Sequence, residues 1–177
     1  MLNVREIQQK DIELVVNYWM NASDDFLTGM GVDLEKMLSR EGLTQMLEDQ
    51  LKLPVESRRA YCVIWESDGI PVGHSNTNPT NYGEEATMHL HLWKPDARKK
   101  GTGTEFVKRT LRLYFENLKL KKLIVEPYAL NPAPHRTLEK AGFTFIKDYI
   151  TTPGFLNFEQ PVKRWEMTRE DFLRLTK

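Results

Sequence analysis

A cluster of glycines and cations is the segment of the chain best suited to chemistry. Residues 98–104 read Arg-Lys-Lys-Gly-Thr-Gly-Thr and lie between a strand-like run and the apolar stripe of a long helix. The first turn of a helix carries unpaired N–H groups and about half a positive charge, so it binds phosphate when a ligand can approach closely. Gly101 and Gly103 leave room for that approach, and the three cations add charge-assisted hydrogen bonds. The segment therefore predicts a pyrophosphate site.

The pattern differs from the two common phosphate loops. A Walker A loop needs Gly-x-x-x-x-Gly-Lys-Ser/Thr, and a dinucleotide fingerprint needs a third glycine where Phe106 stands. The segment is a distinct pattern, Arg-x-x-Gly-x-Gly between a strand and a helix. The simpler alternative is a solvated turn that binds no ligand.

Side chains that can take up a proton lie on strands near this loop. His89 and His91 share one face of the strand before it, and an unperturbed imidazole titrates at about 6.5. His91 is nearer the loop and is the preferred base of the two. Glu126 lies in an apolar run, where burial raises a carboxyl pKa, and Tyr128 shares its face. The alternatives are packed strand histidines and a carboxylate paired with a cation.

Acidic and metal-binding candidates are fewer. Asp24 and Asp25 follow Ser23 in a turn-rich segment, where they can hold an amine or serve as helix caps. His74 and His135 are isolated, so no spacing indicates a metal site.

Hydrophobic periodicity places these residues in one α+β domain over residues 1–177. Alternating and apolar runs predict strands at 2–7, 61–65, 70–74, 87–93, 123–128, 143–150 and 162–167. Helical spacing predicts helices starting after Asp11 and spanning 43–51, 107–118, 136–140 and a short segment around Phe172. Residues 21–36 and 76–85 are rich in turn formers and are expected to be loops. Gly142 suits a left-handed helix cap.

Composition argues against several classes of protein. Lys and Arg number 25, as do Asp and Glu, so no global field favours nucleic acid or an anionic membrane. Cys62 is the only cysteine, which excludes an internal disulfide and suits a reducing compartment. There is neither a signal-peptide pattern nor an apolar run of roughly 18 residues. A cytoplasmic protein is the simplest expectation.

Two motifs, in this order, resemble the GNAT acetyltransferases. Arg98, Gly101 and Gly103 match the acyl-CoA loop of that family, Arg/Gln-x-x-Gly-x-Gly/Ala. Residues 131–143 read Asn-Pro-Ala-Pro-His-Arg-Thr-Leu-Glu-Lys-Ala-Gly-Phe. They are similar to Asn-x-x-Ser-x-Arg-x-Leu-Glu-Lys-x-Gly-Phe of the branch that acetylates ribosomal-protein N-termini. The resemblance is good over residues 61–145.

The resemblance implies a fold and an activity. The fold is a mixed, mostly antiparallel sheet of six to seven strands, flanked by helices and splayed between the fourth and fifth strands. The activity is transfer of an acetyl group from acetyl-CoA to a primary amine, on a small molecule or a peptide N-terminus, by direct attack in a ternary complex without a metal. A non-catalytic acyl-CoA-binding module is the alternative, and both a monomer and a homodimer remain open. The residues assigned to acyl-CoA are Leu92, Trp93, Lys94, Arg98, Lys99, Lys100, Gly101, Thr102, Gly103, Thr104 and Asn131.

The chain departs from the family pattern at a catalytic position. The tyrosine that acts as general acid in many members falls at Leu138, so the acid is unassigned. Asn131 suits a contact with the CoA arm and equally an N-cap before Pro132. The candidate catalytic residues are Glu126, His91 and Tyr128, and the candidate acceptor contacts are Asp24, Asp25 and His89.

Overall fold

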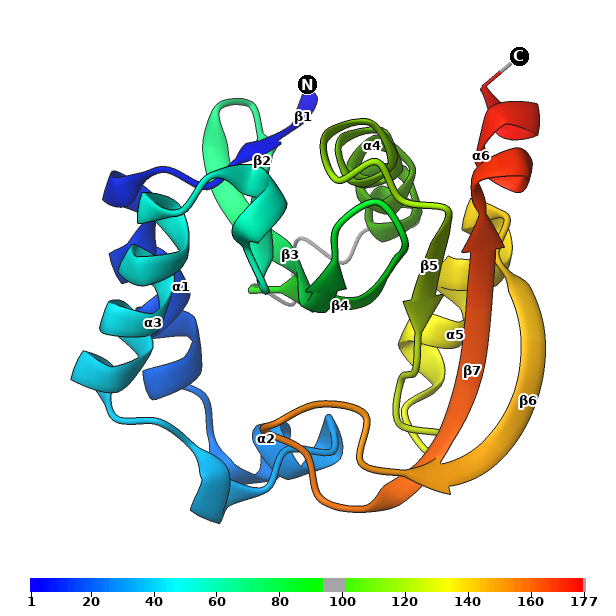
Figure 1. The fold of residues 1–177 in the computed structure, drawn as a ribbon. Coiled ribbons are helices and arrows are strands. Elements are labelled where there is room, and N and C mark those ends of the chain that lie inside the picture. Colours follow the sequence, from blue (N-terminus) through cyan, green and yellow to red (C-terminus); the bar gives the residue numbers. More distant parts are fainter. Residues whose placement is uncertain (94–100, 177) are drawn as a thin grey trace.

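A seven-stranded sheet runs through the part of the chain that the computed structural model describes, residues 1–93 and 101–176 (Figure 1). The strands are β1 (Leu2–Glu6), β2 (Tyr61–Ser67), β3 (Ile70–Asn81), β4 (Glu85–Leu92), β5 (Lys122–Val125), β6 (Thr144–Thr151) and β7 (Gln160–Thr168). Their order is β1-β2-β3-β4-β5-β7-β6, and the only parallel pair among them is β4 with β5. The predicted mixed, mostly antiparallel sheet is confirmed.

Helices cover both faces of this sheet. They are α1 (Ile12–Met20), α2 (Asp24–Gly29), α3 (Arg40–Lys52), α4 (Thr102–Asn117), α5 (Pro132–Ala141) and α6 (Arg169–Leu175). Figure 1 shows α1 and α3 side by side next to the N-terminal strands. The helices α4 and α5 contact each other and pack on the opposite face of the sheet.

The alternation of β2 explains why there are two hydrophobic cores. Successive side chains of a strand point to opposite faces. Tyr61, Val63 and Trp65 enter the larger core with α4, α5 and α6, whereas Cys62 and Ile64 enter a smaller core with α1 and α3. Both faces of the strand are therefore buried, as its unbroken apolar run indicates.

Aromatic and hydroxyl contacts anchor α4 on the sheet. The rings of Trp65 and Phe106 stack with centroids 5.1 Å apart, and Trp65 Nε1 donates to Thr110 Oγ1 over 2.9 Å. One turn further, Tyr114 Oη donates to Ser75 Oγ over 2.8 Å. These buried contacts set the position of the helix and hence of its N-terminus.

Most predicted elements are confirmed, with three corrections. The turn-rich segment 21–36 contains the short helix α2, because Ser23 Oγ accepts from the Phe26 N–H and caps it. Residues 76–81 belong to β3, not to a loop, because they pair with β4. Asp11 is the N-cap residue of α1, but its side chain makes no capping bond to that helix; the carboxylate instead binds Arg5 and accepts from the Gln8 N–H.

The loop between β6 and β7 is tied to the segment after α2 (Figure 1). Asn157 Nδ2 and Gln160 Nε2 both donate to the Gly31 carbonyl, over 2.8 and 2.7 Å, and the Asp33 N–H donates to the Leu156 carbonyl. Gly31 has φ +86, and a Cβ there would lie 2.2 Å from Gln160 Oε1. A glycine is therefore required twice over, by its backbone conformation and by the close approach of Gln160.

We expect Gly31→Ala to destabilise the protein more than Gly69→Ala does. Both glycines have positive φ, so each alanine carries a backbone strain of about 1–2 kcal/mol. Nothing lies within 4 Å of a Cβ at Gly69, whereas at Gly31 the Gln160 amide must move and lose its hydrogen bonds, which adds roughly 1–2 kcal/mol. Urea unfolding of the two variants measures the difference, and equal losses would contradict this account.

Candidate active site

The parallel pairing of β4 with β5 ends early. The paired residues are Glu85 with Lys122, Ala86 with Leu123 and Thr87 with Ile124. Beyond them the chain after β5 pairs with β7 instead, where the Lys163 N–H donates to the Pro127 carbonyl over 3.2 Å. The predicted splay is confirmed, although the fifth strand ends at Val125 and not at Tyr128.

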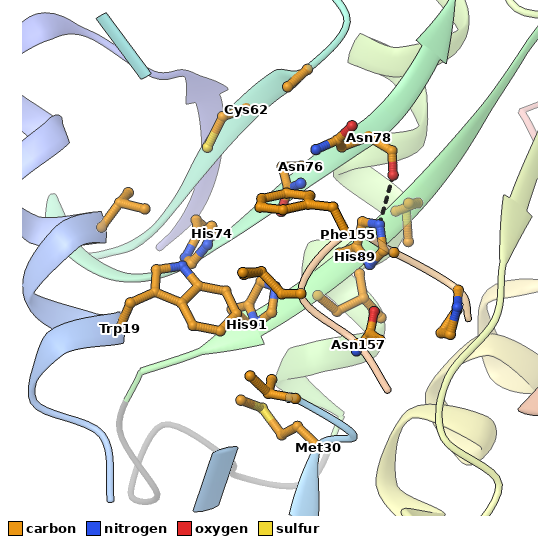
Figure 2. Close-up of a pocket in the computed structure, with 18 of the residues that line it drawn as sticks. Trp19, Met30, Cys62, His74, Asn76, Asn78, His89, His91, Phe155 and Asn157 are labelled. Carbon is orange, nitrogen blue, oxygen red and sulfur yellow. Dashed lines mark hydrogen bonds between the residues drawn. The ribbon is translucent and has the colours of Figure 1, made fainter. Parts of the chain in front are cut away.

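A cavity of about 190 Å³ lies between the separated strands and the helices α1 and α3. Much of its polar lining comes from β3, β4 and the segment after β5, and Figure 2 shows His74, His89 and His91 near Asn76 and Asn78. Trp19, Met30 and residues of the β6–β7 loop cover them (Figure 2). Five of the sequence-predicted residues line this cavity: His89, His91, Glu126, Tyr128 and Asn131.

The N-terminus of α4 has the features of an anion site. Gly101 is the N-cap with φ +87 and makes no side-chain capping bond, and the first intrahelical bond runs from the Glu105 N–H to its carbonyl. The N–H groups of Thr102, Gly103 and Thr104 therefore precede the hydrogen-bonded ladder. A Cβ at Gly103 would have Thr137 Oγ1 at 3.9 Å as its nearest neighbour, so a ligand can approach. Arg98, Lys99, Lys100 and Lys94 lie outside the described residues.

One main-chain contact just after β4 bears on the assignment of Trp93 to the acyl-CoA arm. The Trp93 N–H donates to the Val72 carbonyl over 2.9 Å, so it is already used on the β3 side. Main-chain groups alternate along a strand, so those of Leu90 and Leu92 point to the opposite side, toward the gap. Leu92, and not Trp93, therefore presents its main chain to a ligand there.

Asn131 is the N-cap of α5 but makes no side-chain capping bond, and it lines the cavity. Its amide is therefore not used in the cap that the sequence offered as the alternative. Leu138 is fully buried in the larger core, so this helix carries no proton donor at the position of the family tyrosine.

His74 and His91 form a stacked pair beneath Trp19, with ring centroids 4.6 Å apart (Figure 2). Trp93 Nε1 donates to His74 Nδ1 over 2.7 Å. An indole nitrogen only donates, so the His74 proton is on Nε2. Burial lowers the pKa of His74 to about 3, and burial together with the neighbouring histidines holds the pKa of His91 well below 6.5. Both rings are neutral at physiological pH.

His89 has a different environment. Its Nε2 lies 2.9 Å from the Asn78 carbonyl, drawn as a dashed line in Figure 2. A carbonyl only accepts, so Nε2 carries the proton and Nδ1 of the neutral ring keeps a lone pair. Burial lowers the pKa of His89, while the hydrogen bond to Asn78 and the charge of Glu126 act in the opposite direction.

Glu126 is not the isolated buried carboxylate that the sequence predicted. Its Oε1 lies 3.0 Å from Arg164 Nη1, and Tyr149 Oη donates to the same oxygen. Both partners come from the hairpin of β6 and β7, and Arg164 brings the opposite charge to the carboxylate. The side chain, 9% exposed, is therefore a held negative charge next to His89.

Asp24 and Asp25 lie in the exposed first turn of α2 and do not line the cavity. They stabilise the start of that helix through its dipole. Their predicted place in a loop was wrong because Ser23 caps a helix there.

Several lining residues escaped the sequence reasoning. His74 was set aside as isolated, yet β3 and β4 pair it directly with His91. The turn at residues 82–84 carried part of the signal, since it joins β3 to β4, but the shift in register between Thr77 and Thr80 could not be read from the sequence. Cys62 also lines the cavity, and burial raises the pKa of its thiol, so it is not a thiolate nucleophile at neutral pH.

Residues 1–93 and 101–176 contain neither a metal-binding cluster nor a membrane-spanning helix. No three His, Cys, Asp or Glu side chains are grouped to hold a metal ion. None of the described helices is long and apolar enough to cross a membrane.

Comparisons with known proteins add to this geometry. A family model described as "Acetyltransferase (GNAT) domain" matches residues 1–144. A spermidine N-acetyltransferase from Vibrio cholerae, solved with CoA and spermine, aligns with a TM-score of 0.77 at 18% identity over 97% of this chain and 98% of that one. An aminoglycoside acetyltransferase solved with coenzyme A and kanamycin aligns with a TM-score of 0.74 at 18% identity over 100% of both chains. A search of curated protein sequences gave no match.

We expect the neutral histidines to make the fold sensitive to acid. The unfolded chain binds a proton at His74 below about pH 6.5, whereas the folded chain does so only near pH 3. The stability that neutral His74 contributes is complete above pH 6.5 and is lost by about 1.4 kcal/mol per pH unit as the pH falls from there toward 3.

His74→Asn tests this expectation, because asparagine offers an acceptor to the Trp93 N–H and does not titrate. The free energy of unfolding is measured in urea between about pH 7 and pH 4.5. Its decrease with falling pH should be less steep in the variant, by the slope that corresponds to the uptake of about one proton on unfolding. An unchanged slope would mean that His74 is not the group that resists protonation.

Proposed function

The chain belongs to the GNAT acetyltransferase family, and from that premise we propose that it transfers the acetyl group of acetyl-CoA to a primary amine held between β4 and β5. The early end of the β4–β5 pairing carries this proposal, because it opens a cavity with a proton acceptor on one wall. Direct attack in a ternary complex needs both reactants in that one space.

The residues present fit an acyl-CoA at three points. The first-turn N–H groups of α4, with Arg98, Lys99 and Lys100 before them, suit the pyrophosphate. The main-chain groups of Leu90 and Leu92, which point toward the gap, suit the extended arm of CoA, because that arm can hydrogen-bond to them as a neighbouring strand would. Asn131 offers its free amide at the start of α5. Acetyl-CoA supplies the activated acetyl group, and the chain supplies orientation and proton transfer.

We assign the proton acceptor to His89 and not to His91. His89 Nδ1 has a lone pair fixed by the Asn78 carbonyl, whereas His91 Nδ1 lies 3.3 Å from Tyr18 Oη inside an aromatic cluster. When the amine nitrogen attacks a carbonyl carbon it becomes strongly acidic, so a weak base can remove its proton. His89, with its lowered pKa, is unprotonated and ready above pH 6.5.

Glu126 acts as a positioning residue in this proposal. Its charge favours the imidazolium that His89 becomes, and Arg164 and Tyr149 hold the carboxylate in place. The arrangement follows the general logic of a base supported by a third, charged group.

The proton that the departing thiolate needs has two sources in this geometry. Tyr128 lines the cavity beside Asn131 and Pro134, at the start of α5. Water in the gap is the other source. We retain Tyr128 as the candidate, since Leu138 has no proton to give.

The finer likeness to enzymes that acetylate ribosomal-protein N-termini concerns α5, which packs on α4 and contributes only Pro134, with the N-cap Asn131, to the cavity lining. It therefore says little about the acceptor, and a peptide α-amine stays a proposal. The polyamine and aminoglycoside of the structural neighbours do not transfer either, because likeness at 18% identity concerns the fold.

Three wider predictions accompany this function. We propose that residues 1–177 form one domain, since the sheet joins β1 to β7 without a break in pairing. A cytoplasmic location stays a prediction that rests on the lone, buried thiol of Cys62. Monomer and homodimer both remain open, and β6 is one of the two edge strands at which a second copy can pair.

Acetyl-CoA binding is tested best at Gly103. Unlike Gly101 it does not have positive φ, so Gly103→Glu introduces no backbone strain and places a carboxylate in the first turn, where the dipole tolerates it. The carboxylate should repel the pyrophosphate. At about 100 times its dissociation constant, acetyl-CoA should stabilise the parent by roughly 2.7 kcal/mol and the variant hardly at all.

Lys108→Glu is the matched control, because it places a carboxylate on the exposed side of the same helix beyond the first turn. It should keep most of the thermal shift. Loss of the shift in both variants would point to net charge, and a full shift in Gly103→Glu would remove the pyrophosphate from this helix. A shift without turnover of any amine would favour the binding module.

We expect His89→Gln to lower kcat by about 10²–10⁴-fold while the acetyl-CoA thermal shift is retained. Glutamine can still donate to the Asn78 carbonyl but accepts no proton at neutral pH. The parent should lose activity as the pH falls below 6.5, where His89 becomes protonated. Steady-state rates for His89→Gln and His91→Gln decide between the two histidines; a larger loss in His91→Gln would reverse the assignment.

A further inference from the structure

Building on the proposed acetyl transfer, we infer that the acceptor is a small primary amine with an apolar or aromatic body and no second positive charge. The inference concerns the part of the cavity that faces α1, α3 and the β6–β7 loop, away from the N-terminus of α4.

The wall in that direction is mainly apolar, and its polar members Gln50, Asn157 and Gln160 are hydrogen-bonded to main-chain groups. α1 contributes Trp19, α3 contributes Leu43, Met46 and Leu47, and the loop contributes Phe155 and Leu156. Figure 2 shows Trp19, Met30 and Phe155 around the histidines. Such a wall gains free energy by burying hydrocarbon and offers little to a hydrated ammonium group.

The formal charges on the lining are already paired. Within residues 1–93 and 101–176, the lining carries one cation, Arg58, and one carboxylate, Glu126. Arg58 Nη1 lies 2.5 Å from Glu6 Oε1, and Glu126 is held by Arg164 and Tyr149. A second ammonium in this cavity would therefore lose its hydration without gaining a carboxylate of its own.

The three histidines do not change this balance. His74, His89 and His91 all have lowered pKa values and are neutral at physiological pH. They repel no cation and attract none by charge. They add ring faces and edges, on which an aromatic guest packs well.

Size is compatible with such a guest. The cavity is about 190 Å³. An apolar protein cavity of about 150 Å³ holds benzene, so one ring or a short alkyl chain fits here. The amine at the end of that body then reaches the gap where His89 lies.

The test compares amines that differ in one feature. Pentylamine and cadaverine have the same five-carbon chain, and cadaverine adds a second ammonium; phenethylamine has an aromatic body. Binding is measured by calorimetry to the protein saturated with CoA, so that the result does not depend on turnover. We expect pentylamine and phenethylamine to bind at least about a hundredfold more tightly than cadaverine. Acetylation rates on the same amines are then compared with acetyl-CoA.

Met46→Glu and Met46→Gln complete the design, because the two side chains have equal size and differ in charge. Met46 is partly exposed on α3 and lines the cavity. The glutamate should strengthen cadaverine binding by at least about tenfold and weaken pentylamine binding, while the glutamine should leave the order of the three amines unchanged.

The outcomes separate this inference from the proposed function. Cadaverine binding as tightly as pentylamine, or no amine binding to the CoA-loaded protein, overturns the inference even if some amine is acetylated. Selective binding of the monoamines without acetylation supports the inference about the ligand and overturns the proposed transfer.

Discussion

β4 and β5 are hydrogen-bonded only along residues 85–87 and 122–124, and beyond that point each strand is held by its other neighbour. β4 stays on β3, and the segment after β5 follows β7 through the carbonyl of Pro127. Main-chain groups on the inner edge of β4 therefore lack a strand partner in the gap, which makes them suited to an extended ligand. The cavity, the position of His89 and the approach to α4 all follow from this early separation.

The electrostatics of the gap combine neutral rings with paired charges. Desolvation keeps His74 and His91 uncharged, while one held carboxylate, Glu126, lies close enough to influence His89. A neutral imidazole next to a fixed negative charge can take a proton and be stabilised once it has done so. The same balance explains why a space lined by three histidines is not cationic, and why its apolar walls decide what else can enter.

Closure of the cavity depends on contacts between distant parts of the chain. Gly31 follows α2, and the side chains that bind its carbonyl are 126 and 129 residues further on. The segment after α2 and the β6–β7 loop thus hold each other in place, and both contribute to the lining. Met30 and Phe155 are members of that wall because Gly31 allows the two segments to meet without a side chain between them.

The sequence by itself determined the features that depend on neighbours along the chain. Alternation and helical spacing located the strands and long helices, Gly142 marked the end of α5, and the Arg98–Gly103 pattern predicts an anion site at the start of α4. Two ordered motifs were enough to predict the family and the splayed sheet.

Only the tertiary structure decided which distant groups share an environment. Strand register stacked His74 on His91, and the closing hairpin brought Arg164 to Glu126. Hydrophobic periodicity indicates only which face of a helix or strand is buried. The pKa of a side chain, or whether a main-chain donor lacks a partner, depends on groups that packing brings within a few ångströms, often from far along the chain.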